Sequence, residues 1–193
     1  FMESGHDGFL VLGDGSALDL GKLIASTANQ TSPVWDVEDV GDNWNRANAA
    51  LIPQIVAVST TAGTRAEVGR AAVIINNKDQ VKKIIFHPKV LPSIVICDPE
   101  LTVGMPPDIT VGTGMDAFTH CVEAVLSPMI DPPAEAVGLD GIERIFKGEN
   151  LLKAVKDGSN KEARWNMMMA ATEGAMAFTK GLGAVHSMSH ACG

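Results

Sequence analysis

The chain has 193 residues, and 46% of them are hydrophobic, which is enough to bury a core and excludes a disordered polypeptide. Its formal net charge is −8 at pH 7 and it has no run rich in Lys and Arg, which argues against nucleic acid or an anionic membrane as the principal partner. A small-molecule substrate or another protein is the partner that this composition favours.

The first half of the chain is expected to alternate strands, turns and a helix. Residues 8–13 (GFLVLG) are a short apolar run bounded by glycines, typical of a strand buried on both faces of a parallel sheet. Ser16 is the expected N-cap of a helix over residues 17–25, where apolar positions recur at helical spacing. The polar stretch 31–50 predicts a loop with one helical turn, and residues 54–59 (QIVAVS) predict the next strand.

Strand patterns continue to residue 97 and then stop. Residues 71–75 and 82–86 flank an Asn-Asn turn, which predicts a hairpin attached to the sheet. Residues 93–97 are the last expected strand. From residue 106 onward the pattern is helical, with small and apolar residues on most faces, so the shift in composition near Met105 predicts a domain boundary.

Cysteine usage and the ends of the chain indicate the compartment. Cys97, Cys121 and Cys192 are odd in number and lack a CxxC spacing, which predicts reduced thiols with packing roles rather than disulfides. No stretch has the length and apolar content of a membrane span, and the first residues lack both the basic and the apolar region of a signal peptide. The expected localisation is cytoplasmic, with no membrane partner.

Two turns at strand ends have the composition of phosphate-binding loops. Residues 13–16 (GDGS) lie between a strand and a helix, where backbone N–H groups and the helix dipole favour an anion. Residues 60–64 (TTAGT) follow the second strand, at the edge where open α/β sheets bind ligands. Each turn has an equally good structural explanation, because tight turns favour glycine and hydroxyl residues in any case. Asp14 also brings a negative charge that opposes a phosphate.

Four side chains on two helical stripes have the character of metal ligands. Asp116 and His120 are four residues apart in a segment that is otherwise small or apolar, so they share one face of a helix. Burying a carboxylate and an imidazole is costly unless a partner compensates them, and a divalent cation would do so. A buried Asp–His hydrogen bond is the simpler alternative for this helix alone. His186 and His190 supply a second stripe, and mixed oxygen and nitrogen ligation suits Fe²⁺ or Zn²⁺.

Five segments together resemble the iron-containing alcohol dehydrogenases, whose fold is shared with glycerol dehydrogenase and dehydroquinate synthase. Residues 13–22 (GDGSALDLGK) are similar to the family's GGGSxxDxAK pyrophosphate loop, and residues 60–68 (TTAGTRAEV) are similar to its TTAGTGSEV segment. Residues 98–102, 113–120 and 181–190 match three further family segments in the same order. Agreement at five ordered sites makes this resemblance specific.

The resemblance implies a fold, a reaction and a set of site residues. It implies an incomplete Rossmann-like α/β nucleotide-binding sheet, as a partial dinucleotide-binding domain over residues 1–105, followed by a partial all-α metal-binding domain over residues 106–193. Hydride would pass between a small alcohol or aldehyde and a nicotinamide cofactor, NAD or NADP, with the metal as Lewis acid. The implied metal ligands are Asp116, His120 and His186, and His190 is the implied catalytic proton-relay residue. The implied cofactor contacts are Gly13, Gly15, Ser16, Asp19, Thr60, Thr61, Thr64, Lys82 and Leu101.

The chain also departs from the family pattern. The family has a further histidine ligand shortly after the segment that ends here at Gly193, and its N-terminal strands and C-terminal helices have no counterpart, which indicates a fragment. Asp14 replaces a loop glycine and Arg65 replaces another, and we hypothesise that these two side chains pair. Two alternatives stay open: a catalytically defective remnant that serves as an oligomerisation or binding module, and a zinc enzyme of the glycerol dehydrogenase type. A homo-oligomer is expected, because exposed apolar faces drive association.

Overall fold

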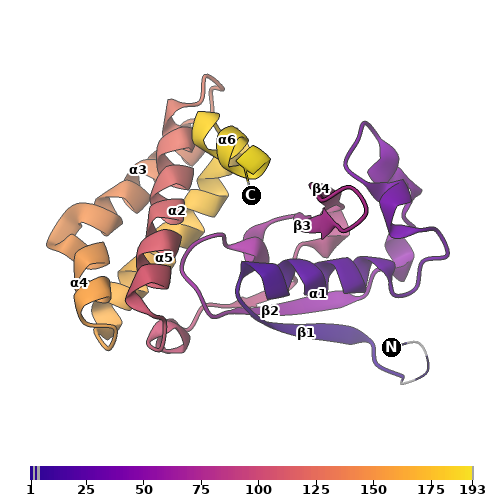
Figure 1. Cartoon of the computed structure of the whole chain (residues 1–193), viewed down its shortest axis with the longest axis horizontal. Coiled ribbons are helices and arrows are strands. Elements are labelled where there is room, and N and C mark those ends of the chain that lie inside the picture. Colours follow the sequence, from indigo (N-terminus) through magenta and orange to yellow (C-terminus); the bar gives the residue numbers. More distant parts are fainter. Residues whose placement is uncertain (2, 4, 193) are drawn as a thin grey trace. The chain divides into compact units, whose positions relative to one another are not determined.

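The computed structural model describes residues 1–193 except residues 2, 4 and 193, and the chain forms two compact units (Figure 1). The first unit contains residues 1–59 and 66–96, and the second contains residues 60–65 and 97–193. The expected division between residues 105 and 106 stays a prediction. Among the described residues, no helix combines the length and the apolar content that a membrane span requires.

A parallel sheet with one helix packed on it forms the core of the first unit. The strand order is β1-β2-β5, and β1 pairs with β2 from Gly8 opposite Gln54 to Gly13 opposite Ser59. The elements of this sheet and its helix are β1 (Gly8–Gly13), α1 (Gly15–Thr27), β2 (Gln54–Ser59) and β5 (Ile94–Ile96). The buried side chains that join α1 to the sheet include Val11, Leu18, Ala25, Ile55 and Ala57. The strands expected over residues 8–13 and 54–59 are confirmed, and the strand expected over 93–97 is shorter.

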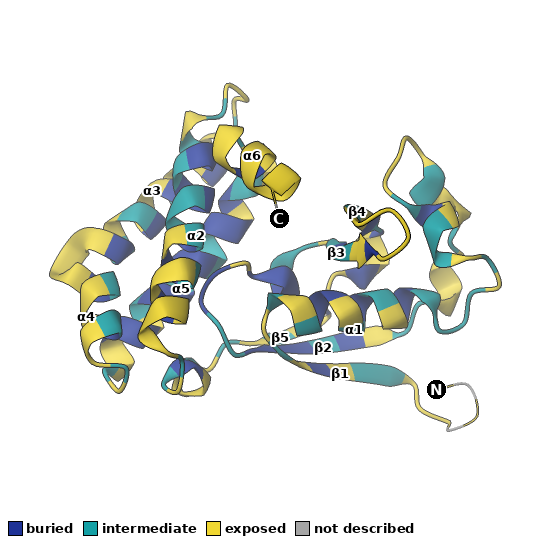
Figure 2. Cartoon of the chain, in the orientation of Figure 1, coloured by how far each residue is buried: buried dark blue, intermediate teal, exposed yellow. Residues whose placement is uncertain are grey.

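Strand β1 is buried on one face only. Side chains alternate across a strand, so Val11 faces α1 while Leu10 and Leu12 face the opposite side and are 72% and 60% exposed. The expectation of burial on both faces is therefore wrong, because α1 covers a single face of the sheet in the described residues (Figure 2).

The N-cap of α1 is Asp14, not the expected Ser16. The Oδ1 atom of Asp14 accepts a hydrogen bond of 2.9 Å from the backbone N–H of Ala17, and the Asp14 backbone is extended. A carboxylate in this position satisfies a free backbone donor and also interacts favourably with the positive end of the helix dipole. Ser16 consequently lies inside the first turn, and the helix begins at Gly15.

The expected hairpin is confirmed, but its attachment to the sheet is not. Strands β3 (Ala71–Asn76) and β4 (Val81–Phe86) pair antiparallel and form a two-stranded sheet of their own among the described residues. The loop expected to hold one helical turn holds three short 3-10 helices, η1 (Val34–Val37), η2 (Asn43–Arg46) and η3 (Ala49–Leu51). Further short 3-10 helices of this unit are η4 (Ala66–Val68) and η5 (Pro88–Val90).

The second unit is helical, as expected for this part of the chain. Its helices are α2 (Pro107–Leu126), α3 (Pro132–Phe146), α4 (Asn150–Lys156), α5 (Lys161–Ala177) and α6 (Ala184–Cys192), with the short 3-10 helices η6 (Pro99–Thr102), η7 (Lys147–Glu149) and η8 (Phe178–Lys180). Its core consists mainly of alanines and methionines of α5, together with one residue each from α2, α3 and α4 and Ala62 of the segment 60–65. Small residues let the backbones approach closely. A Cβ at Gly141 would lie 2.6 Å from the Sγ atom of Cys121, so this contact between α3 and α2 requires glycine.

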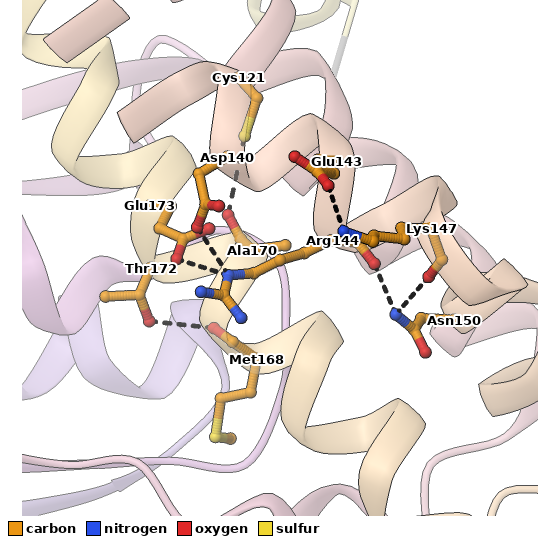
Figure 3. Close-up of polar contacts among 10 residues, drawn as sticks. All are labelled: Cys121, Asp140, Glu143, Arg144, Lys147, Asn150, Met168, Ala170, Thr172 and Glu173. Carbon is orange, nitrogen blue, oxygen red and sulfur yellow. Dashed lines mark hydrogen bonds and ion pairs between the residues drawn. The ribbon is translucent and has the colours of Figure 1, made fainter. Parts of the chain in front are cut away.

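Polar side chains also connect α3 to α5 (Figure 3). The Nε atom of Arg144 donates to Asp140 at 2.9 Å and to Glu173 at 2.7 Å, and its guanidinium group lies over the ring of Trp165. The side-chain amide of Asn150 donates to the carbonyls of Arg144 and Lys147, which satisfies acceptors at the end of α3. These contacts hold the helices on which the site residues of α2 rest.

Candidate metal centre

Helices α2 and α6 bring the three predicted metal ligands together. Asp116 and His120 occupy successive turns of α2, and His186 lies in the first turn of α6. The Oδ1 atom of Asp116 is 3.8 Å from Nδ1 of His120 and 3.7 Å from Nε2 of His186. One potential ligand atom from each residue lies within 4.8 Å of the other two. The fold thus brings two residues of α2 close to one residue of α6, which is a separate helix.

The electrostatics of this cluster suit a cation. The Nδ1 atom of His120 is buried and has no hydrogen-bond partner among the described residues, although a buried polar atom without a partner is costly. Burial lowers the pKa of His120, and the neighbouring His186 lowers it further against the opposing effect of Asp116. A neutral imidazole is the form that binds a metal.

The alternative of a direct Asp116–His120 hydrogen bond does not fit the geometry of this cluster. The separation of 3.8 Å is too long for a hydrogen bond between a ring nitrogen and a carboxylate oxygen. The rings of His120 and His186 lie 4.4 Å apart between centroids, so two protonated imidazolium groups would repel each other. One oxygen and two nitrogen donors around a small space therefore fit a divalent cation such as Fe²⁺ or Zn²⁺.

His190 lies one turn beyond His186 on α6 and is exposed. Its ring centroid is 6.1 Å from that of His186, so it is a neighbour of the cluster and not one of its three converging groups. Its role as a proton-relay residue stays a prediction.

Glu123 belongs to this site, although the sequence analysis did not single it out. It is 8% exposed, and it accepts hydrogen bonds from the backbone N–H groups of Gly183 and Val185, at 2.9 and 2.6 Å. Its Oε2 atom is 2.6 Å from Nδ1 of His186. Burial alone would raise the pKa of Glu123, but these hydrogen bonds outweigh burial and lower the pKa below its usual value. The signal was present in the sequence, because Asp116, His120 and Glu123 follow the spacing of one helical face.

Five of the expected cofactor contacts lie in the first unit: Gly13, Gly15, Ser16, Asp19 and Lys82. Gly13 has φ +150°, and a Cβ there would lie 2.6 Å from the Cβ of Ala17, so this turn requires glycine. Strands β1 and β2 are parallel and end in register, with Gly13 opposite Ser59 at one edge of the sheet. This is the carboxyl edge, where α/β sheets bind ligands.

Asp19 has a structural role in the first unit. Its carboxylate is buried, pairs with Nζ of Lys22 at 3.0 Å, and accepts a hydrogen bond from the backbone N–H of Val73. Lys22 in turn donates to backbone carbonyls of the segment 66–71. Both oxygens of Asp19 are thereby engaged in joining α1 to β3.

The other four expected cofactor contacts, Thr60, Thr61, Thr64 and Leu101, lie in the second unit. The segment 60–65 is anchored there, because Ala62 is part of the helical core and a Cβ at Gly63 would lie 2.7 Å from the Cβ of Thr113. Thr64 and Leu101 are exposed, and Thr60 and Thr61 are half-buried. Arg65 is buried and donates to the Sγ atom of Cys97 at 2.8 Å, and its pairing with Asp14 stays a prediction.

Comparison with known proteins identifies the family. Residues 1–99 match the model of the iron-containing alcohol dehydrogenases, and residues 110–193 match the C-terminal model of the same family. The chain belongs to the iron-containing alcohol dehydrogenase family. The expected resemblance to this family is thereby confirmed, as is the combination of a parallel sheet with a helical unit.

Individual relatives match at least 97% of the chain. The 4-hydroxybutyrate dehydrogenase of Cupriavidus necator is 43% identical over 100% of this chain and 50% of its own length. The crystal structure of a 1,3-propanediol oxidoreductase matches with a TM-score of 0.89 and 39% identity, over 98% of this chain and 48% of that one. The sulfoacetaldehyde reductase of Bifidobacterium kashiwanohense, in complex with NAD+, matches with a TM-score of 0.89 and 31% identity, over 97% of this chain and 49% of that one. The chain thus spans about half the length of these relatives.

Proposed function

We propose that the protein is a metal-dependent alcohol dehydrogenase that transfers hydride between a small alcohol or aldehyde and a nicotinamide cofactor. The observation that carries this proposal is the convergence of Asp116, His120 and His186, with one ligand atom of each within 4.8 Å of the others. Family membership supports the reaction class, and the names of the relatives support small alcohols and aldehydes as substrates.

Asp116, His120 and His186 would hold the metal in this proposal, with Fe²⁺ as the first candidate and Zn²⁺ as the second. When bound, such an ion acts as a Lewis acid toward the substrate oxygen. The contribution of the chain itself is to keep His120 neutral by burial and to hold His186 in place through Glu123. His190 is exposed beside this cluster, where it could exchange a proton with water, and we propose it as the proton relay.

The proposed cofactor is NAD, with NADP as the alternative. The NAD+ complex of the sulfoacetaldehyde reductase supports this choice. The proposed contacts are the glycine turn, the threonines of the segment 60–65, Lys82 and Leu101. Asp14 places a negative charge next to the proposed phosphate position, so Asp14→Gly should tighten dinucleotide binding even though it removes the N-cap of α1. Calorimetric titration with NAD tests this, and binding that is unchanged or weaker contradicts it.

A homo-oligomer is part of the proposal. In the β1-β2-β5 register, Leu10 and Leu12 lie on the same side of the sheet as Ile94 and Ile96, and all four are at least 45% exposed. A contiguous apolar face of this kind favours association. Light scattering that shows a monomer across a range of concentrations contradicts this part of the proposal.

Metal analysis of the purified chain, combined with its affinity for NAD and NADP, tests the proposed function. We expect one Fe²⁺ or Zn²⁺ per chain, lost in His120→Ala and retained in the matched variant His6→Ala, which removes a histidine from the first unit. Absence of both metal and dinucleotide binding overturns the proposal and favours an oligomerisation or binding module.

A further inference from the structure

We propose that Glu123 is a positioning residue of the metal centre. Its carboxylate leaves the lone pair of His186 on the nitrogen that faces Asp116, and it fixes the first turn of α6 against α2. This inference rests on the proposed metal-dependent function. It concerns a side chain that is outside the set of three ligands and touches one of them directly.

The tautomer of His186 follows from the contacts of Glu123. The two oxygens of Glu123 accept backbone hydrogen bonds, Oε2 from Gly183 and Oε1 from Val185, so both oxygens act as acceptors. The Nδ1 atom of His186, 2.6 Å from Oε2, must then be the donor and carry the hydrogen. In a neutral imidazole the other nitrogen is left with a lone pair. That nitrogen, Nε2, is the one that lies 3.7 Å from Asp116.

The same carboxylate positions the helix that carries His186. The backbone N–H groups at the start of a helix have no partner within the helix, and Glu123 accepts hydrogen bonds from two of them. Gly183 leaves the necessary space, because a Cβ there would lie 2.9 Å from Oε1 and 3.1 Å from Cδ of Glu123. Position and ring orientation of His186 therefore depend on one buried side chain.

The connection before α6 is anchored independently of Glu123. The hydroxyl of Ser127 donates to the carbonyl of Lys180 at 2.7 Å, and the buried Nζ of Lys180 donates to the carbonyl of Val125 at 3.0 Å. Loss of the Glu123 carboxylate should therefore alter the start of α6 without releasing the whole segment from α2.

Glu123→Gln is the informative substitution, because it keeps the size of the side chain but replaces one oxygen with an NH₂ donor. If this NH₂ group faces His186, Nδ1 must become the acceptor and the hydrogen moves to Nε2, which blocks the lone pair needed for a metal. If it faces Val185 instead, it opposes a backbone N–H group and displaces the first turn of α6. Carboxylates that orient a ligand histidine typically change metal affinity by about 10- to 100-fold when they are mutated.

Two measurements test the role of Glu123. In the metal-free wild-type chain, two-bond ¹H–¹⁵N correlations at mildly alkaline pH should show His186 with hydrogen on Nδ1, and Glu123→Gln should shift it toward hydrogen on Nε2. Titration with Co²⁺, followed by its visible absorption, should show binding about 10- to 100-fold weaker in Glu123→Gln than in the wild type. Glu173→Gln is the matched control in the same unit, since it makes the same charge change and contacts Arg144 rather than a ligand.

Gly183→Ala provides a second perturbation if Glu123→Gln fails to fold. It displaces the same carboxylate without changing any charge, and it should weaken Co²⁺ binding in the same direction. A wild-type tautomer together with wild-type Co²⁺ affinity in the variant that folds overturns the role of Glu123. A wild-type chain that binds neither Co²⁺ nor Zn²⁺ overturns the proposed metal centre instead, and the tautomer measurement distinguishes the two failures because it needs no metal.

Discussion

Glu173 on α5 should make the stability of the chain depend on pH in a direction unusual for a carboxylate. Its side chain is 18% exposed, and its Oε1 atom accepts a hydrogen bond from Arg144 (Figure 3). Burial raises the pKa of Glu173 from 4.5 to about 7, the neighbouring Asp140 adds to the increase, and Arg144 opposes it. The folded chain therefore keeps this proton at pH values where the unfolded chain has released it.

The sign and size of the effect follow from linkage. Between pH 4.5 and about 7 the folded state binds more protons than the unfolded state at this group, so the free energy of unfolding falls as the pH rises. At about 1.4 kcal/mol per pKa unit, the difference between 4.5 and about 7 corresponds to an upper limit of about 3.5 kcal/mol. Asp140 is half exposed and its effect is screened by solvent, so we expect about 1–3 kcal/mol.

Urea unfolding at several pH values, followed by far-UV circular dichroism, measures this contribution. Glu173→Gln is uncharged at every pH, so the difference in unfolding free energy between wild type and Glu173→Gln should fall as the pH rises from 4.5 to about 7. Glu143→Gln on α3 is the control, because Glu143 is exposed and its carboxylate pairs with Lys147 on the surface, so its slope should match the wild type. A difference that stays constant or increases with pH would refute the reasoning.

Two further predictions concern packing. Lys22→Met should destabilise the chain by about 3–5 kcal/mol, because it leaves Asp19 charged, buried and without its cation. Urea unfolding should show that part of this loss is recovered in the double variant with Asp19→Ala. Strictly additive losses in the two single variants and the double variant would contradict the pairing. Gly63→Ala should cost about 1–3 kcal/mol, because its Cβ would meet both Cβ and Cα of Thr113 at 2.7 and 2.9 Å. The matched control is Gly69→Ala, whose Cβ meets only a carbonyl oxygen at 3.7 Å, and equal melting temperatures for the two variants would count against this account.

Much of the candidate site could be predicted from the sequence because its signals are local. The spacing of four between Asp116 and His120 places both on one face of any helix, and the strands over residues 8–13 and 54–59 are marked by short apolar runs between turns. The N-cap of α1 was predicted wrongly, since both Asp14 and Ser16 are good capping residues and only the backbone path decides which oxygen reaches a free N–H.

Contacts between residues that are distant in the sequence could not be predicted from local signals. The attachment of the hairpin was predicted wrongly, because local patterns show that two strands pair with each other but not which sheet they join. Glu123 is separated from His186 by 63 positions, and its importance depends on the path of the connection that carries Gly183 to its carboxylate.

The sequence by itself determined the family, the order of strands and helices, and the three side chains with the chemistry of metal ligands. These three features depend on residue type and on short spacings along the chain. Both can be read from the periodicity and from the order of the motifs. Only the tertiary structure decided that α6 lies against α2 so that Nε2 of His186 approaches Asp116, that Glu123 contacts Nδ1 of His186, and that Asp19 pairs with Lys22. The physical reason is that each buried polar atom must find a partner from whichever segment packing brings beside it, and that segment can lie anywhere along the chain.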